Sequence, residues 1–171
     1  MRRIASLNFW GILALFLFSV NIAQAQSANI FFSTPPRQVY EGENVSVEIR
    51  VKSEAQSINA VSGIFSFPEN LVGVISIAKD KSIIDIWTRE PKTIPGKILF
   101  EGVILNPGFQ GANGYLFKVT FKAKESGVVF FNFSEGAILA NDGLGTNVLA
   151  MLDSANFRIL PGTIPENVVV T

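Results

Sequence analysis

The side chains that most often perform catalysis or bind metals are scarce in this sequence. It contains no histidine and no cysteine, which removes the usual general base, the thiol nucleophile and the commonest ligands of zinc, copper and haem. Two carboxylates can still hydrolyse a glycoside, and the candidate pairs are Glu48 with Glu101 and Asp80 with Asp85. Solvated charges on strands and turns explain these residues better. We therefore predict a protein that is not an enzyme and that carries no cofactor.

A group of oxygen-bearing side chains near the C-terminal end was considered as a calcium site. Asn141-Asp142-Gly143, Asn147 and Asp153 supply the hard oxygen ligands that calcium prefers. Their spacing does not match a calcium-binding EF-hand loop, which needs alternating acids and a closing Glu. Asn, Asp and Gly are also the residues that a tight turn with positive φ requires. The sequence therefore favours a turn, and we predict no metal site.

Aromatic residues suggest a second kind of binding, to polysaccharide. A sugar platform needs exposed aromatic rings that lie in one plane, and the candidates are Tyr40, Trp87, Phe109 and Tyr115. Only Trp87 is expected on a flat sheet face. A platform of one ring is poor, so protein recognition is favoured and polysaccharide binding remains the alternative.

The charge of the chain argues against nucleic acid as a partner. Lys and Arg number 14 and Asp and Glu also number 14 in 171 residues, whereas a nucleic-acid binder needs a surplus of basic side chains to displace phosphate counterions.

The N-terminus has the pattern of an export signal. Met1-Arg2-Arg3 is followed by an uncharged apolar run from 9 to 20, and Ala23-Gln24-Ala25 supplies the small residues that a signal peptidase recognises. We expect cleavage before Gln26, which predicts a secreted or cell-surface protein. An uncleaved anchor is the competing interpretation, but the apolar run is short for a span of roughly 20 residues. Membrane association would then come only from this segment or from an anchor beyond the C-terminus.

After the signal, the sequence predicts an all-β domain over 26–160, with 161–171 as a linker or tail. Asn44–Lys52 alternates strictly, with Val45 and its same-parity neighbours on one face and charged residues on the other. The same alternation, bounded by Gly, Pro and Asn turns, predicts strands over 28–33, 44–52, 58–67, 71–79, 83–87, 97–105, 115–124, 128–133 and 154–160. Ser53–Gln56 is expected to be a polar connection and Thr88–Gly96 a loop, while Val148–Leu152 holds at most one helical turn. Such regular short strands indicate an antiparallel sandwich or barrel.

Four stretches in this order resemble the bacterial cohesin modules. They are EGENVSVEIRV from Glu41, INAVSGIFSFPENLVGVISI from Ile58, GANGYLFKVTFKAKESGVVFF from Gly111 and GAILANDG from Gly136. The resemblance spans roughly Asn29 to Leu160, and it implies an antiparallel nine-stranded β-sandwich with jelly-roll topology, a fold shared with some cellulose-binding modules. None of the four stretches is a catalytic signature.

The resemblance also implies a partner and a face. Cohesins hold the calcium-loaded dockerin modules of secreted proteins, on a sheet face that corresponds here to strands 58–67, 83–87, 97–105 and 128–133. Type I cohesins commonly carry an Asn and an Asp on the first of these strands, at positions that align with Ala60 and Ser62. The aromatic residue usual on the next strand is matched by Trp87. The partner is therefore predicted to be a protein that is dockerin-like, without the usual polar pair to contact it.

Strand parity gathers one set of residues on this outer face, and we predict that they bind the partner. The predicted site consists of Ser62, Ile64, Asp85, Trp87, Leu99, Glu101 and Val103. Exposed apolar patches mark partner sites, and Trp is a favoured hot-spot residue. The alternative is that another part of the chain, such as Thr88–Gly96, covers this row.

Overall fold

The computed structural model describes residues 28–33 and 35–162, and these contain β-strands but no helix. Consequently no helix in this part of the chain is long and apolar enough to cross a membrane. The predicted signal peptide, 1–25, and most of the predicted tail, 161–171, lie outside the described residues. The prediction of an all-β sandwich with jelly-roll topology is confirmed.

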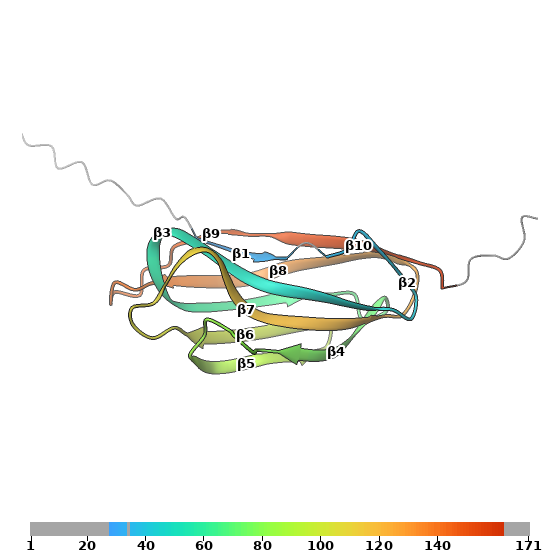
Figure 1. Cartoon of the computed structure of the whole chain (residues 1–171), viewed down its shortest axis with the longest axis horizontal. Coiled ribbons are helices and arrows are strands. Elements are labelled where there is room, and N and C mark those ends of the chain that lie inside the picture. Colours follow the sequence, from blue (N-terminus) through green and yellow to red (C-terminus); the bar gives the residue numbers. More distant parts are fainter. Residues whose placement is uncertain (1–27, 34, 163–171) are drawn as a thin grey trace, which may run out of the picture.

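Ten strands make up the described domain, and they run along its long axis (Figure 1). Their bounds are β1 Ala28–Phe32, β2 Gln38–Tyr40, β3 Asn44–Ser66, β4 Val72–Ala78, β5 Ile86–Ile94, β6 Lys97–Val103, β7 Phe109–Ala123, β8 Gly127–Ala140, β9 Leu149–Leu152 and β10 Ser154–Leu160.

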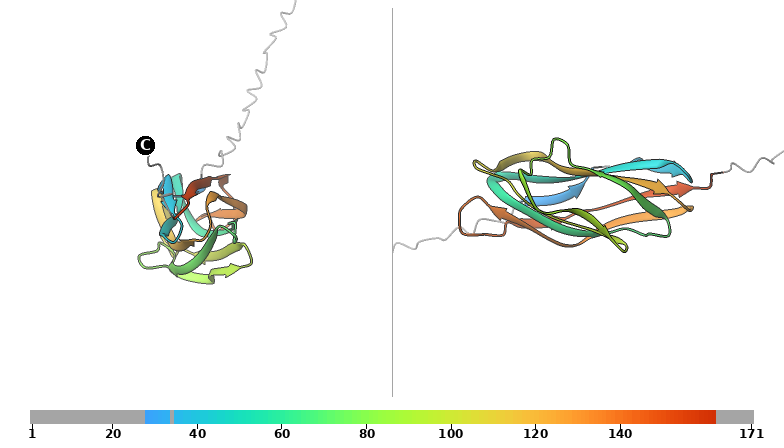
Figure 2. Two further views of the ribbon diagram at one scale, coloured as in Figure 1. Left: turned by 90° about the vertical axis from the view of Figure 1, so that its right-hand side faces the viewer. Right: turned by 90° about the horizontal axis from the view of Figure 1, so that it is seen from below.

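Strand β3 belongs to both layers of the sandwich. Its first half pairs with β7 and β1, and its second half pairs with β6 and β8. One layer therefore has the order β4-β7-β3-β1-β9 and the other the order β5-β6-β3-β8-β10-β2. Figure 2 shows the two layers from the end and from below.

The polar connection predicted over Ser53–Gln56 is wrong, because β3 continues through it as extended chain. Ser53 is buried and its hydroxyl donates to the carbonyl of Gln56 at 2.7 Å, which satisfies the polar group inside the bend. The ladder with β7 shifts register between Val51 and Ser53 and again before Ile58. These irregularities allow the strand to bend from one layer into the other without ending.

The core lies between the layers and follows the predicted alternation. Val45, Val47, Ile49 and Val51 are at most 2% exposed, as the strict pattern of Asn44–Lys52 predicts. Aromatic rings fill the centre, where Phe32, Phe65, Phe121 and Phe131 pack within 6.4 Å of a neighbouring centroid. Full burial of one such ring stabilises the fold by about 1.5–3 kcal/mol.

Two short strands were not predicted as strands. Since the predicted strands 44–52 and 58–67 form the single strand β3, the described domain has ten strands where nine were expected. Residues 38–40 were expected to lead into a turn, but they form β2, which pairs in parallel with β10. Leu149–Leu152 was expected to hold at most a helical turn, but it forms β9, which pairs in parallel with β1. Both pairings join segments far apart in the sequence, and local patterning does not reveal them.

The strand predicted over Ile83–Trp87 begins late and extends into the expected loop. Strand β5 starts at Ile86 and continues to Ile94, including Pro91. Proline is tolerated here because β5 is an edge strand that pairs only with β6.

Candidate functional site

The outer face of strands β5, β6, β3 and β8 carries residues in register across all four strands. The first row consists of Ile86, Val103, Ala60 and Leu139, which are paired side by side. We call these four residues the apolar row. Ile86 is 51% exposed, and nothing polar interrupts the sequence of side chains. None of the four side chains carries a charge or a hydrogen-bonding group, which is unusual for the outside of a sheet.

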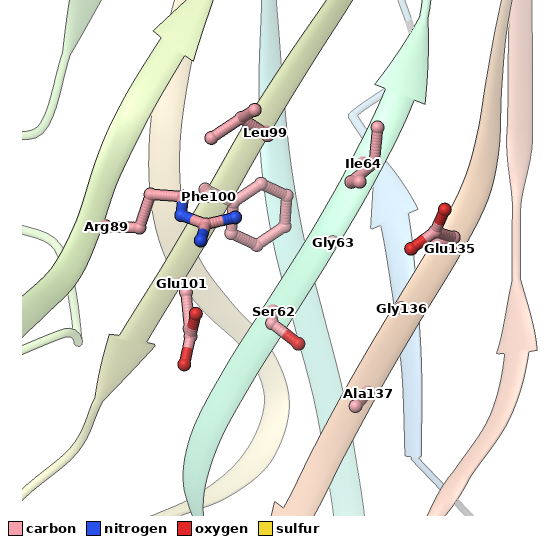
Figure 3. Close-up of a pocket in the computed structure, with 10 residues that line it drawn as sticks. All are labelled: Ser62, Gly63, Ile64, Arg89, Leu99, Phe100, Glu101, Glu135, Gly136 and Ala137. Atoms are coloured by element: carbon pink, nitrogen blue, oxygen red, sulfur yellow. The ribbon is translucent and has the colours of Figure 1, made fainter.

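The next two rows are polar and charged. Arg89, Glu101, Ser62 and Ala137 form the second row, and Lys92, Leu99, Ile64 and Glu135 form the third. A depression of about 280 Å³ lies among them, with Arg89 extending across β6 above it and Glu135 at its opposite side (Figure 3). Within the described chain, neither Arg89 nor the two glutamates form an ion pair.

Small residues line the floor of the depression. Gly63 pairs with Gly136 on one side and Phe100 on the other. A Cβ atom at Gly63 would lie 2.8 Å from the Phe100 ring, which occupies the space beneath it. Glycine at this position therefore allows a large core ring to sit directly under the outer face.

Five of the seven predicted site residues are brought together here. Ser62, Ile64, Leu99, Glu101 and Val103 all lie on the outer face of β3 and β6, as strand parity predicts. The segment after Trp87, proposed as a possible cover, continues instead as β5 beside β6. It extends the sheet and leaves the face open.

The prediction that Trp87 lies on this outer face is wrong. Trp87 pairs with Gly102, whose row faces inward with Phe100. Its ring meets the core ring of Phe117 edge to face at 6.1 Å, and the Lys79 ammonium lies 6.0 Å from it. Lys79 in turn forms an ion pair with Glu90 at 2.7 Å. Trp87 therefore closes the side of the sandwich between β4 and β5.

Asp85, the other predicted site residue, also lies outside the paired rows of the outer face, because it precedes the first residue of β5. Its carboxylate accepts a hydrogen bond from the backbone N–H of Leu105 at 2.8 Å. This contact fixes the end of β6 against the start of β5. Asp85 thus positions the face without forming part of the apolar row.

Sequence reasoning missed Ile86 and Leu139. Placing Asp85 and Trp87 on the outer face implies, by alternation, that Ile86 faces inward. The segment Ile83-Ile84-Asp85-Ile86-Trp87 is apolar at both parities, so alternation alone does not orient it. The inward glycine at 102 was an available signal, since its missing side chain leaves room for Ile84.

The other chemical candidates have structural roles. Glu48 and Glu101 lie in different layers, and Glu48 is paired with Arg50 at 2.7 Å. Asp142 accepts from the Leu144 N–H, and Asn147 accepts from the Ile138 and Leu149 N–H groups. The Thr146 hydroxyl and the Leu144 N–H hold the pKa of Asp142 below its usual value. In the described chain no three acidic residues are grouped so as to hold a metal ion.

The four aromatic residues considered for sugar binding do not form a platform. Trp87 and Phe109 pack against the core. The Arg50 guanidinium covers the Tyr115 ring at 5.5 Å, and the Tyr115 hydroxyl donates to the Ala78 carbonyl. Burial, and then the charges of Glu48 and Asp80, raise the pKa of this phenol. Of the four, only Tyr40 is well exposed, at 45%.

Comparison with solved structures identifies the fold. A non-cellulosomal cohesin from Archaeoglobus fulgidus matches 78% of this chain and 91% of its own, with a TM-score of 0.63 and 18% identity. The cohesin module of a family 33 glycoside hydrolase from Clostridium perfringens matches 79% and 98%, with a TM-score of 0.66 and 15% identity. A Clostridium thermocellum cohesin, solved in a type I complex with a dockerin, matches 78% and 99%, with a TM-score of 0.64 and 13% identity.

These similarities define the class of fold: the described domain has the cohesin-like jelly-roll fold. No protein-family model matches the sequence, and no curated protein matches it. The relationship is therefore visible in the backbone and not in the overall sequence.

Proposed function

We propose that this chain is an exported, non-catalytic module that recognises a protein partner through the outer face of β5, β6, β3 and β8. The observation that carries the proposal is the apolar row of Ile86, Val103, Ala60 and Leu139. Partly exposed aliphatic side chains in one continuous row lose contact with water when a partner covers them, and this drives association.

The dimensions of the row fit a helix laid across the strands. Four strands about 4.8 Å apart give a row about 14 Å long. An amphipathic helix places apolar residues i and i+7 about 10 Å apart, so two to three turns would cover the row. A dockerin-like helical partner is the class that this geometry and the cohesin-like fold favour together.

Charged residues beside the row would orient such a helix. Arg89, Glu101 and Glu135 line the depression, and Lys92 pairs with Leu99 beside it, so both signs of charge are present. Charges at the rim of an interface contribute more to orientation and association rate than to affinity. Since Ala60 and Ser62 stand where type I cohesins commonly carry an Asn and an Asp, we expect contacts here to be more apolar.

The absence of chemistry in the sequence supports the non-catalytic part of the proposal. The chain has no His or Cys, and the carboxylate pair Glu48 and Glu101 is separated between the layers. The basic start, apolar run and Ala-x-Ala ending of the first 25 residues support export to the cell surface or medium.

A pull-down with matched variants tests this proposal. Residues 26–171 are immobilised and exposed to secreted proteins of the source organism. Ile86→Asp places a charge in the apolar row, whereas Ile75→Asp makes the same change on β4, where the isoleucine is also 51% exposed. We expect a captured protein that Ile86→Asp loses and Ile75→Asp retains. Equal capture by both variants would contradict the assignment of this face.

A further inference from the structure

The same sheet carries a second exposed surface, on the far side of β8 from the depression. Here the outward residues belong to β8, β10 and β2. Arg158 of β10 pairs with Val128 on one side and Gln38 on the other, and Asn156 pairs with Phe130. Val128 is 40% exposed and Phe130 is 53% exposed. We call Arg37, Gln38, Val128, Phe130, Asn156 and Arg158 the arginine surface.

Two depressions flank the Arg158 side chain. One, of about 410 Å³, is lined by Arg37, Gln38, Val128, Asn156 and Arg158, and the other, of about 390 Å³, continues along β10 to Leu160 and Pro161. Both are lined by Val128 and Arg158, so they lie next to each other along β10, and we call the two together the trough. This trough does not overlap the residues of the apolar row.

The two arginines of the trough are close neighbours without acidic partners. The Arg158 N–H donates to the Arg37 carbonyl at 3.0 Å, which places the two residues side by side. In the part of the chain that the structure describes, neither guanidinium forms an ion pair or a hydrogen bond. Both residues line the larger depression, and an anionic group bound there would be attracted by both positive charges.

The nearest acidic residues along the chain are engaged elsewhere. Glu41 accepts hydrogen bonds from the N–H groups of Ser126, at 2.7 Å, and Gly162, at 3.3 Å. Glu43 accepts from the Tyr40 N–H at 2.9 Å. These carboxylates secure the β2 turn and the end of β10. Neither carboxylate forms an ion pair with Arg37 or Arg158, so both guanidinium groups remain available to a ligand.

We propose that the arginine surface binds an acidic polysaccharide whose sugar rings bear carboxylates. A guanidinium presents a planar pair of N–H donors that matches a carboxylate. The side-chain amides of Gln38 and Asn156 donate to and accept from hydroxyl groups. Phe130 and Tyr40 are exposed on the same outer face and offer apolar contact to the C–H faces of sugar rings.

An acidic polypeptide fits the same surface less well. Polypeptide recognition on a sheet usually needs a long free edge or pockets for alternate side chains. The edge strand here, β2, is only three residues long. Mixed amide, guanidinium and aromatic groups without a deep apolar pocket favour a hydroxyl-rich, carboxylate-bearing chain.

The test measures binding of polygalacturonate by calorimetry at low and at physiological salt, with its neutral methyl ester as the matched ligand. The paired variant Arg37→Gln with Arg158→Gln removes the two charges. Arg89→Gln, on the other part of the sheet, is the control for the loss of a surface arginine. All three proteins are first compared by thermal unfolding, which should agree because the altered residues are exposed.

We expect polygalacturonate to bind the native chain at least tenfold more tightly than it binds the paired variant, since each charge-assisted hydrogen bond contributes more than a neutral one. Arg89→Gln should bind like the native chain, the methyl ester should bind at least tenfold more weakly, and Phe130→Ser should also weaken binding. No binding of polygalacturonate, equal loss in Arg89→Gln, or equal binding of polyglutamate would overturn the proposal. The proposed protein partner is tested by Ile86→Asp, which leaves this trough intact, so the two proposals fail separately.

Discussion

The two halves of β3 present very different outer faces above the same kind of core. In the first half, Glu48 pairs with Arg50 at 2.7 Å and Ser46 bonds to Thr120 at 3.0 Å. Arg50 also donates to Asn113 and covers Tyr115. This half satisfies its polar groups within the domain.

In the second half, small and aliphatic residues replace the charges. Ala60, Ser62 and Ile64 face outward beside Val103, Glu101 and Leu99. The inner residues of both halves are equally buried, as Val47 and Val61 illustrate at 1% exposed each. The fold therefore constrains the inner rows alike, and the difference between the outer rows is the basis for the proposed partner face on the second half.

The largest expected effect concerns a residue behind the second half. Trp87→Ala removes a ring that packs on Phe117 and lies under Lys79. We expect the free energy of unfolding to fall by about 2–3 kcal/mol, because the lost ring leaves a cavity at the side of the sandwich. Urea unfolding measures this. Partner binding at a temperature where the variant is folded should be unchanged, and a loss of binding with native stability would return Trp87 to the interface.

A charge placed on each half of β3 tests the comparison directly. Ala60→Glu puts a carboxylate in the middle of the apolar row, and Ser46→Glu makes a similar change on the first half. We expect Ala60→Glu to weaken binding of the captured partner at least tenfold, since the partner would have to desolvate the charge. Ser46→Glu should bind like the native chain. Titration calorimetry with the purified partner distinguishes them, and equal affinities would remove the basis of the comparison.

The small residues under the second half should be needed for stability. Gly63→Ala brings a Cβ within 2.8 Å of the Phe100 ring, so we expect a loss of about 1–2 kcal/mol from overpacking. Adding Phe100→Leu should make room, so the double variant should lose less than the sum of the single changes. Additive losses would mean that this contact is not the cause.

The ion pair on the first half of β3 should contribute little to stability, and its contribution should fall as salt is added. Glu48→Gln breaks the ion pair with Arg50, and we expect a loss of under about 1 kcal/mol, because partly exposed pairs are screened. Thermal unfolding in low and high salt checks this, and the difference from the native chain should shrink in high salt. If this substitution changed the affinity for the partner, the interface would have to include the first half as well.

The smallest expected effect is a pH dependence of stability that arises at Glu41, which lies outside both halves of β3. Hydrogen bonds from the N–H groups of Gly162 and Ser126 lower the pKa of Glu41 in the folded state. Its contribution to stability is therefore present above the unfolded pKa and is lost as the pH falls through the folded pKa. Glu41→Gln should weaken the acid dependence of unfolding in that range, and an unchanged profile would contradict this role.

Strict alternation made much of the fold predictable. In Asn44–Lys52 and in Ile58–Phe67, one parity is apolar, and the structure buries that parity. In β7 the neighbouring residues Leu116 and Phe117 have opposite parity, yet both are buried. A register shift opposite Ile49 and Arg50 makes Leu116 the extra residue in β7, and a bulge of this kind is not visible in one strand alone.

The site was predictable only where neighbouring strands have clear parity. Ser62 and Glu101 are polar and mark the solvent side of β3 and β6, so Ser62, Ile64, Leu99, Glu101 and Val103 were placed correctly on one face. In β5 both parities are apolar, and pairing with Gly102 decides that Trp87 points inward and Ile86 outward. The orientation of an edge strand depends on its neighbour, and the sequence of the strand does not contain that information.

The most direct test of the central claim is methyl NMR of the chain with its purified partner. Ile86, Val103, Leu99, Ile64 and Leu139 report on the outer face of β5, β6, β3 and β8, and Ile75 of β4 reports on the rest of the surface. We predict that partner addition shifts or broadens the methyl signals of the first group and leaves Ile75 unchanged. Perturbation centred on Ile75, with the first group unaffected, would contradict the assignment of the partner to this face.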